Sequence, residues 1–413
     1  MKQGYLSEYF AGVAAKMLTA TEIDPQTSRG HEYQGVDTFR AFLGTPSEKQ
    51  KIPVTYVWLT DDGAPEKLEL TGTWYDSRSK QRHRDPEYRL YYPVAAEEVV
   101  YRARAGDILL FCLPRQGPLL ALSCPSESTI AESLLWLFNL NRTAEFSNNQ
   151  RDLRNERGAE LDFTARYILD LIEIDVALTE DEWLDRLVHK FGSTFPPTGE
   201  FSEFARKQLP EADPIGSPDE TLLAWIEFEE RLFPTLEKHI VGIRLLNGFI
   251  QDGVADIDAF VGYSLSVQNR RKARAGSALE NHIATILEQN KIQFSRGSIT
   301  ETRNRPDFLF PSAQAYLNNQ FPSTRLTMLG VKSTCKDRWR QVLSEADRIP
   351  RKHLLTLEPS ISENQTNEMK GKLLQLVLPK RLHETYRPAQ RDWLMTLEDF
   401  IRLVRQRQEL SLA

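Results

Sequence analysis

Four residues in the second half of the sequence have types and an order that suit metal-assisted hydrolysis of a phosphodiester: Glu280, Asp307, Lys332 and Glu345. Carboxylates bind Mg²⁺, which prefers oxygen ligands, and the bound metal polarises a phosphoryl oxygen and lowers the pKa of its water. A lysine beside the metal can orient that water and offset the negative charge that develops in the reaction. We take these four as candidate catalytic residues, with Glu280, Asp307 and Glu345 as candidate Mg²⁺ ligands.

The local sequence places two of these residues at the ends of strands. Asp307 lies in RPDFLF, where Pro306 suits the start of a strand because proline cannot donate to the ladder. Lys332 ends the apolar run TMLGVK. Two adjacent strands would therefore bring a carboxylate and an ammonium to the same end of a sheet. We expect Glu280 on the helix before Asp307 and Glu345 on the helix after Lys332.

Each of these signals has an ordinary structural explanation when it is taken alone. A Pro-Asp pair is common, a lysine at a strand end is usually solvated, and single glutamates are typical of helix surfaces. The usual nuclease pattern also has a carboxylate two residues before the lysine, and that position is Gly330 here. The pattern is complete only if another residue supplies the second carboxylate.

The elements around the candidate site alternate between helix and strand. Apolar residues at helical spacing occupy 279–287 and 339–346. Short apolar runs predict strands at 307–310, 327–332, 353–357 and 373–378. A mixed sheet flanked by helices is an α/β arrangement.

The first 155 residues have a mainly β pattern, with short runs bounded by Gly, Pro and Asp. Strands are predicted at 52–59, 68–74 and 107–113, and a helix at 129–138. The polar run 146–158 has no apolar period and indicates a hinge. Amphipathic helices are predicted after it at 180–191, 200–209 and 220–246.

A chain of 413 residues is too long for one ordinary core, so two domains are expected. We place one domain at 1–155, a hinge or linker at 156–180, and a second domain with the candidate site at 181–413.

Composition excludes several classes of protein. Cys112, Cys124 and Cys335 lack metal-ligand spacing, which indicates a reducing compartment without a disulfide framework or a zinc site. The most apolar stretch, 107–124, is interrupted by prolines and falls short of the roughly 20 apolar residues of a membrane span. The first residues contain no apolar signal core, so we expect a soluble protein of the bacterial cytoplasm. The net charge of −6 does not indicate a nucleic-acid partner, but only the face that meets phosphate has to be basic.

Three runs carry a resemblance to a known family: VQNRRKARAGSALENH, RPDFLFPSAQAY and LGVKSTCKDRWRQVLSEADRI. Across 264–350 they closely resemble the EcoRII-type restriction endonucleases, and the similarity extends over most of 180–413. The family implies a restriction-endonuclease-like core of the PD-(D/E)XK superfamily and Mg²⁺-dependent cleavage of double-stranded DNA. It also implies that a glutamate of the following helix replaces the missing strand carboxylate. Glu345 matches that residue, and Glu280, Asp307 and Lys332 match the other catalytic positions.

The turn after the catalytic strand holds Lys336, Asp337 and Arg338. Lysine and arginine donate to guanine and aspartate accepts from cytosine, so this order suits consecutive C·G pairs. The turn is equally consistent with a charged helix N-terminus, but the family implies that it contacts the CC:GG part of the site.

The run NRRKAR supplies further DNA-binding candidates. Asn269 falls where the family places an amide that touches the central base pair from the minor groove. Four cations follow, and phosphate binding is expected of them: Arg270, Arg271, Lys272 and Arg274. The sequence departs from EcoRII-type enzymes around 225–227, where WIE stands in place of a short arginine run, so the resemblance does not fix the exact target between CC and GG.

Two basic, turn-rich arms stand out in the first half. The first arm, TSRGHEYQG, presents Arg29, His31, Tyr33 and Gln34. The second arm, within 73–93, presents Arg78, Lys80, Arg82, Arg84, Asp85, Glu87 and Arg89. Such alternating charges suit either base edges in a major groove or a solvated hairpin. Their order resembles the effector domain of EcoRII-type enzymes, a DNA-binding pseudobarrel similar to that of plant B-three transcription factors.

The sequence therefore predicts a type II site-specific enzyme that cuts double-stranded DNA at a short CC…GG site. The resemblance implies that the N-terminal effector domain binds a second DNA copy and restrains cleavage, and that the C-terminal halves form a homodimer. Two alternatives stay open: an endonuclease directed by base modification, and a DNA-binding regulator with an inactive core. The full catalytic set argues against the regulator, and the lack of an evident aromatic cage weakens the modification hypothesis.

Overall fold

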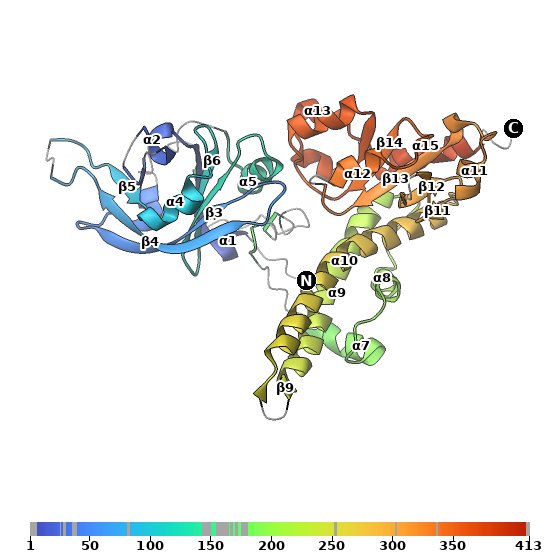
Figure 1. Cartoon of the computed structure of the whole chain (residues 1–413), viewed down its shortest axis with the longest axis horizontal. Helices are drawn as coiled ribbons and strands as arrows, with labels where there is room; N and C mark the ends of the chain where they lie inside the picture. Colours follow the sequence, from blue (N-terminus) through green and yellow to red (C-terminus); the bar gives the residue numbers. More distant parts are fainter. Residues whose placement is uncertain are drawn as a thin grey trace. The chain divides into compact units, whose positions relative to one another are not determined.

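The computed structural model describes residues 6–24, 26–27, 30–34, 39–80, 83–142, 150–153, 165, 168–169, 172–174, 181–251, 254–301, 304–335 and 338–409. The chain divides into two compact units (Figure 1). The N-terminal unit comprises Met1–Val176 and Pro359–Gln365, and the C-terminal unit comprises Ala177–Glu358 and Thr366–Ala413. The division falls inside 156–180, where the linker is predicted, but most of that stretch lies outside the described residues.

The N-terminal unit is built on one eight-stranded sheet with the order β2-β5-β4-β3-β7-β6-β1-β8. Strands β3 and β7 pair in parallel and the other neighbours are antiparallel. The strands are β1 Phe10–Met17, β2 Glu32–Tyr33, β3 Gln50–Trp58, β4 Glu66–Asp76, β5 Tyr88–Tyr91, β6 Ile108–Pro114, β7 Leu119–Cys124 and β8 Gln150–Asp152. The mainly β prediction is therefore confirmed, with β3, β4 and β6 at the predicted places and β1, β2, β5, β7 and β8 as additions.

Short helices accompany this sheet, and the longest is α5, Thr129–Phe138, as the sequence predicts. Ser128 caps it by accepting a hydrogen bond from the Ala131 backbone N–H. The others are α1 Leu6–Tyr9, α2 Ala20–Ile23, α3 Arg40–Leu43, η2 Val94–Ala96 and α4 Glu97–Val100.

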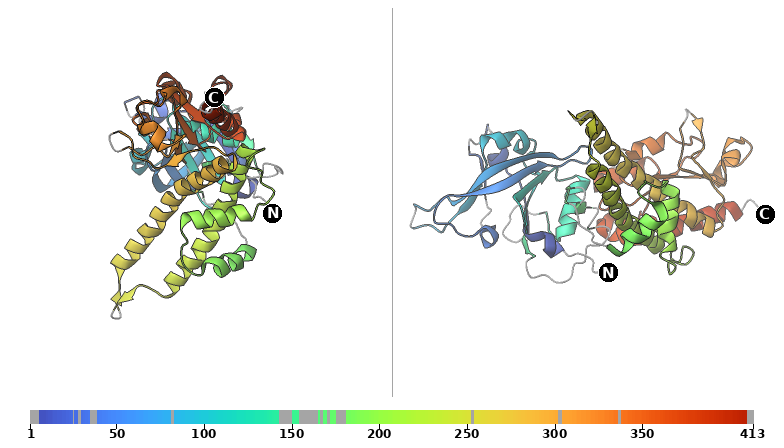
Figure 2. Two further views of the ribbon diagram at one scale, coloured as in Figure 1. Left: turned by 90° about the vertical axis from the view of Figure 1, so that its right-hand side faces the viewer. Right: turned by 90° about the horizontal axis from the view of Figure 1, so that it is seen from below.

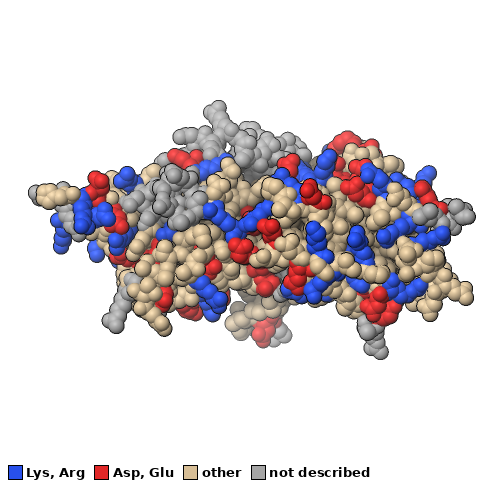
Figure 3. Space-filling view, turned by 90° about the horizontal axis from the view of Figure 1, so that it is seen from above, with Lys and Arg blue, Asp and Glu red and all other residues tan. Residues whose placement is uncertain are grey.

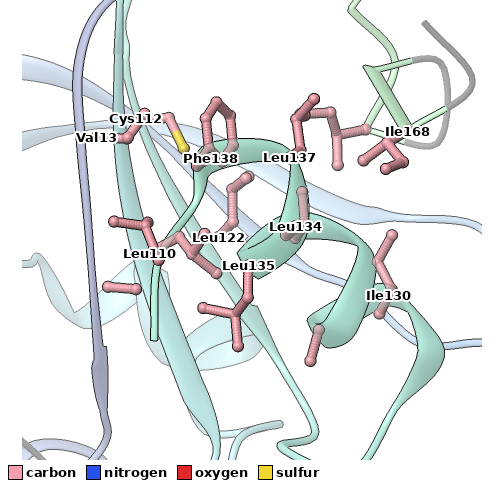
Figure 4. Packing of buried hydrophobic residues seen from close by; sticks show 14 of the residues in the cluster. Val13, Leu110, Cys112, Leu122, Ile130, Leu134, Leu135, Leu137, Phe138 and Ile168 are labelled. Carbon is pink, nitrogen blue, oxygen red and sulfur yellow. The ribbon is translucent and has the colours of Figure 1, made fainter. Parts of the chain in front are cut away.

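Both faces of the N-terminal sheet bury apolar side chains. Along β6, Leu110 and Cys112 belong to one core cluster, whereas Leu109 and Phe111 belong to the other. This alternation is the two-residue period of a strand. Helix α5 covers the first face, with Leu134 and Phe138 among the side chains packed there (Figure 4). A strand that is buried on both faces has a continuous apolar run, which is why ILLFC was visible in the sequence.

The C-terminal unit begins with a helical part. Helices α9 (Pro218–Leu246) and α10 (Ile257–Gln289) run side by side and project away from the sheet (Figures 1 and 2). Two short strands, β9 (Ile250–Gln251) and β10 (Val254–Ala255), join them at the tip. Helices α7 (Asp181–Phe191) and α8 (Thr198–Lys207) pack on this pair.

A five-stranded mixed sheet follows, with the order β11-β12-β13-β14-β15. The first three strands are antiparallel neighbours, and β13, β14 and β15 are parallel. They are β11 Ser295–Arg296, β12 Phe308–Phe310, β13 Thr327–Lys332, β14 Lys352–Thr356 and β15 Leu374–Val377. This confirms the predicted α/β arrangement.

Helices flank this sheet: α11 Ala313–Leu317, η5 Ser323–Arg325, α12 Trp339–Leu343, α13 Glu363–Gly371, η7 Lys380–Thr385, α14 Pro388–Arg391 and α15 Leu397–Glu409. The helix predicted at 339–346 ends early, at Leu343, and Ala346 has a left-handed φ of 51°. None of the helices among the described residues is long and apolar enough to cross a membrane.

His353 is a titratable group in the core of the C-terminal unit. Its side chain on β14 is fully buried and packs edge-on against Phe400, with ring centroids 5.1 Å apart. Burial lowers the pKa of His353 to about 3, and the positive charge of Arg407 adds to the shift. The folded protein therefore holds His353 neutral at neutral pH.

Acid is expected to destabilise this unit through His353. The unfolded histidine titrates near 6.5 and the folded one near 3, so the stabilisation present above pH 6.5 is lost as the pH falls toward 3. His353→Leu should therefore reduce the drop in unfolding free energy between about pH 7 and about pH 5 by about 2 kcal/mol, measured by urea denaturation. The same change at the exposed His189 is the control. An equal pH dependence in the parent and His353→Leu would contradict this account.

Candidate active site

Asp307 and Lys332 meet at one end of the C-terminal sheet. Asp307 immediately precedes β12, and Lys332 is the last residue of the neighbouring strand β13. The Asp307 Oδ2 atom accepts hydrogen bonds from Lys332 Nζ at 2.9 Å and from the Val331 backbone N–H at 2.6 Å. Both side chains keep partial exposure, 15% for Asp307 and 19% for Lys332. The sheet thus places a carboxylate and an ammonium together where a solvent-borne ligand can reach them.

Glu345 enters the same site from a turn and not from a helix, which corrects the sequence-based placement. Helix α12 ends at Leu343, and the carbonyl oxygen of Ser344 accepts a hydrogen bond from Asn304 Nδ2 at 2.6 Å. That bond ties the turn to the loop before Asp307. Burial raises the pKa of Glu345 to about 7; nearby Lys332 opposes the shift and Asp307 adds to it. The three side chains therefore share one electrostatic environment.

Gly330 occupies the strand position where the usual pattern has a carboxylate, and the structure gives a physical reason for glycine there. A Cβ atom at Gly330 would lie 2.9 Å from Cγ2 and 3.1 Å from Cγ1 of Val342. Val342 is fully buried in α12 and cannot yield easily. Close packing of α12 on β13 thus disfavours a side chain at residue 330.

Glu280 lies on α10, and its carboxylate interacts electrostatically with Asp307 and Lys332. Its Oε2 atom is 3.2 Å from Arg296 Nη2. Burial raises the pKa of Glu280 and the charge of Asp307 adds to the shift, whereas Arg296 and Lys332 lower it. Sequence analysis did not single out Arg296, because its position on the two-residue strand β11 gives no local signal.

The donor set fits a hard divalent cation. The Oε2 atom of Glu345 is buried and has no hydrogen-bond partner in the described part of the chain, and such an orphaned carboxylate oxygen is costly without a compensating charge. Asp307 supplies a second oxygen donor nearby, and oxygen ligands suit Mg²⁺. Among the described residues, however, no three acidic, histidine or cysteine side chains already stand close enough to form a preassembled metal site.

Two of the three residues expected to contact C·G pairs, Lys336 and Asp337, lie outside the described residues. Arg338 is the N-cap of α12, and its backbone N–H donates to the Cys335 carbonyl at 2.8 Å. The predicted helix start after the catalytic strand is therefore at Trp339.

The NRRKAR run lies within α10, and its members differ in availability. Asn269 and Arg270 are exposed, and the Arg270 guanidinium stands 4.0 Å from the centre of the Phe195 ring. Arg271 is exposed but hydrogen-bonds Glu237 Oε1 at 2.6 Å. Arg274 is buried at 6% exposure and pairs with Glu229. The interpretation of Arg274 as a phosphate ligand is therefore wrong, because the helix turns its side chain into the core.

The first N-terminal arm is only partly available to a ligand. Arg29 lies outside the described residues. Tyr33 is 1% exposed and packs on Tyr92 and Phe111, so it is a core residue and not a base contact. His31 stacks on Tyr92 and its Nε2 atom is 3.1 Å from Glu97 Oε1.

The backbone of Gln34 is fixed from both sides. Its N–H donates to Glu22 at 2.7 Å and its carbonyl accepts from Lys16 Nζ at 2.8 Å. Glu22 and Lys16 are both buried and pair with each other at 2.7 Å.

The second arm is stiffened by ion pairs. Glu87 accepts from Arg78 at 2.8 Å and from Arg89 at 3.1 Å. Arg89 also donates to Glu32 at 2.7 Å, and Glu32 comes from the first arm. The two arms are thus joined, also through pairing of β2 with β5. Of the predicted DNA contacts in the second arm, Lys80, Arg84 and Asp85 are exposed, and Arg82 lies outside the described residues.

Comparison with known proteins bears on the C-terminal unit. Residues 233–401, which include Glu280, Asp307, Lys332 and Glu345, match the family model described as EcoRII C terminal. This part of the chain is therefore similar to the C-terminal part of the EcoRII-type restriction endonucleases. A stretch of 186 residues is 45% identical to the type II restriction enzyme EcoRII of Escherichia coli, and it spans 45% of this chain and 45% of that enzyme.

Two solved structures also resemble this chain. One is metal-depleted Ecl18kI in complex with uncleaved, modified DNA, with 19% identity and a TM-score of 0.45 over 57% of this chain and 87% of that one. The other is a complex of restriction endonuclease PspGI with substrate DNA, with 16% identity and a TM-score of 0.44 over 52% of this chain and 94% of that one.

Proposed function

We propose that this protein is a Mg²⁺-dependent type II restriction endonuclease that hydrolyses double-stranded DNA at a short CC…GG site. The observation that carries the proposal is the meeting of Asp307, Lys332 and Glu345 at one sheet end, inside the segment that matches the EcoRII C-terminal family. Gly330 supports the proposal, because its packing against Val342 disfavours a carboxylate on the strand itself.

Each side chain has a distinct role in this proposal. Asp307 and Glu345, with Glu280 beside them, would hold Mg²⁺, which when bound supplies Lewis-acid activation of the phosphate and of water. Lys332, held by Asp307, would orient the attacking water and offset charge on the phosphate in the transition state. The partial burial of these groups strengthens every charge interaction among them, because less water screens it.

DNA recognition is proposed at the turn that follows the lysine. Lys336, Asp337 and Arg338 would contact the outer C·G pairs, and Asn269 the central pair from the minor groove. Arg270 and Arg271 would hold phosphate. On the face shown in Figure 3, lysines and arginines are interspersed with acidic residues.

The N-terminal unit is proposed as the effector domain, a pseudobarrel that binds a second DNA copy and restrains cleavage. The exposed Lys80, Arg84 and Asp85 are the side chains best placed for that contact, and Arg78, Glu87 and Arg89 would stiffen the arm behind them. An arm that is already rigid loses less conformational entropy when it binds.

A homodimer is proposed through the C-terminal unit, because cutting both strands of a duplex calls for two active sites. The tip of the α9–α10 pair exposes a row of apolar side chains at 46% to 89%: Leu245, Leu246, Ile250, Val254, Ile257, Phe260, Val261 and Leu265. Several exposed apolar side chains on one part of a protein are typical of an interaction site. A symmetric dimer would bring the same row of each copy together.

The experiment that tests this function is digestion of plasmid DNA with Mg²⁺, followed by sequencing of the ends. The parent is expected to cut at one short sequence bounded by CC and GG. Lys332→Ala should lose at least about 100-fold in cleavage rate while specific binding stays near the parental value, because the lysine acts on the transition state. Lys372→Ala, at an exposed lysine, is the control. Comparable rates for Lys332→Ala and parent would rule the assignment out.

A further inference from the structure

Arg296 is a cation of the candidate active site that none of the proposed roles uses. It lies on β11, and its register partner on β12 is Phe308, the residue after Asp307. The backbone N–H of the next residue, Gly297, donates to the Asp307 carbonyl at 3.2 Å. The edge strand of the sheet therefore places Arg296 beside the proposed metal-binding aspartate.

The guanidinium of Arg296 is held by several partners. Its Nη2 atom donates to Glu280 Oε2 at 3.2 Å, and its Nη1 and Nη2 atoms donate to Asn281 Oδ1 at 3.3 and 3.4 Å. The Asn281 amide nitrogen in turn donates to the buried Ser202 Oγ at 3.4 Å. The Arg296 Cζ atom lies 5.5 Å from the centre of the Phe308 ring. A side chain that is already ordered in this way loses less conformational entropy when it binds a ligand.

The same guanidinium keeps hydrogen-bonding capacity for a ligand. An arginine side chain has five N–H donors, and the hydrogen bonds of Arg296 within the described part of the chain come from Nη1 and Nη2. Its Nε N–H takes part in none of them. The side chain is 38% exposed, so an anion from solution can reach it. Arginine binds phosphate oxygens through a planar fork of N–H groups, which gives the contact a defined geometry.

The charges of the site favour a cation at this position. Glu280, Asp307 and Glu345 are all carboxyl groups, and a phosphodiester that approaches them carries a further negative charge. Lys332 is already paired with Asp307, with Nζ 2.9 Å from Oδ2. Arg296 supplies a second positive charge that is still open to solvent. Attraction between this charge and a phosphate is strengthened where carboxyl groups and protein displace part of the water.

We propose that Arg296 is a further substrate-binding residue of the active site: its guanidinium donates to a non-bridging oxygen of the scissile phosphate, while Glu280 and Asn281 hold it in position. The inference rests on the proposed function, because it takes DNA as the substrate of Asp307 and Lys332. An arginine that only neutralised Glu280 would be indifferent to the charge of any single phosphate. This difference makes the proposal testable.

The test is a thermodynamic cycle with the full-length protein, without divalent metal and at one salt concentration. Sequencing the ends of digested plasmid first locates the scissile phosphate. Three target duplexes are then compared: an unmodified one, one with a neutral methylphosphonate at the scissile phosphate, and one with the same group two phosphates away.

Arg296→Ala should bind the unmodified duplex about tenfold more weakly than the parent, because a charge-assisted hydrogen bond is lost. On the duplex that is neutral at the scissile phosphate, that difference should nearly vanish, because the parent has no phosphate charge to contact there. It should return when the neutral group lies two phosphates away. Arg296→Gln removes the charge but keeps a side chain that can hydrogen-bond to Asn281. It should behave like Arg296→Ala, and it carries the test if the alanine variant does not fold.

Arg402→Ala is the matched control. Arg402 is also a partly exposed arginine, and it pairs with Glu398 and Asp399 at 2.8 and 2.9 Å. Its loss removes the same charge from the same unit and should leave affinity for all three duplexes parental. If Arg402→Ala depended on the scissile phosphate as strongly as Arg296→Ala, the effect would be one of overall charge, and the proposal would be overturned.

The remaining outcomes separate the contact from the function on which it rests. An equal loss on all three duplexes for Arg296→Ala and Arg296→Gln overturns the phosphate contact, and so does parental affinity in both variants while the parent cuts at a fixed sequence. A parent that cuts DNA at no fixed sequence overturns the proposed function, and the contact with it.

Discussion

Glu345→Ala is expected to abolish DNA cleavage as completely as Asp307→Ala, with a loss of at least about 100-fold in rate for each. Because residue 330 is glycine, the strand itself supplies no carboxylate. Without Glu345, Asp307 would be the main carboxylate left to bind the proposed cation. Binding to target DNA should be retained, because neither residue is assigned to base recognition. The measurement is single-turnover cleavage of a duplex at saturating enzyme with Mg²⁺.

Two further variants make this prediction specific. Glu384→Ala, at an exposed glutamate, controls for loss of a negative charge and should cut at the parental rate. Moving the carboxylate back to the strand, in Gly330→Asp combined with Glu345→Ala, should not restore cleavage. The new Cβ would meet Val342 at about 3 Å, inside ordinary contact distance. Normal cleavage by Glu345→Ala would show that the second carboxylate is a different residue.

Removing the N-terminal unit is expected to raise cleavage of DNA that carries a single target site. A tethered domain competes for the active site at high effective concentration, so weak docking is enough to restrain cleavage. A second DNA copy bound by the arms would favour the open state only through its higher affinity for that state. Coupling energies between two sites of a protein typically correspond to changes of roughly 5-fold to 150-fold in equilibrium affinity. The comparison is single-site cleavage by the full chain and by residues from about 180 onward at one salt concentration.

A variant of the full chain tests the same idea without deletion. Lys80→Ala combined with Arg84→Ala removes two exposed cations of the second arm and leaves its ion pairs intact. We expect this protein to lose its preference for two-site plasmids and to keep a low rate on single-site DNA. Lys51→Ala combined with Arg104→Ala is a control with the same charge change in the same unit. A truncated protein that cuts single-site DNA no faster than the full chain would exclude autoinhibition.

Local sequence patterns were enough to predict the elements that hold the candidate site. The run TMLGVK became β13 with the predicted bounds, because a short apolar run between turn signals suits a strand that is covered on both faces. The apolar period of 129–138 likewise gave α5. β1 escaped notice because FAGVAAKM is rich in alanine and glycine, which have low strand propensity, and its place between β6 and β8 comes from long-range pairing.

The sequence by itself determined which residue types could do the chemistry. Glu280, Asp307, Lys332 and Glu345 lie in sequence motifs that can be recognised without a structure. Only the tertiary structure decided how residues distant in the chain meet. It turned Arg274 and Tyr33 inward, away from their expected ligands. It packs residue 330 against Val342 and places Glu345 in a turn after α12. It also brings the Cys335 backbone N–H into a hydrogen bond with Glu358. A local pattern records the period of one element, whereas side-chain burial and polar partners depend on which elements pack together, and that is set by contacts between parts of the chain far apart in sequence.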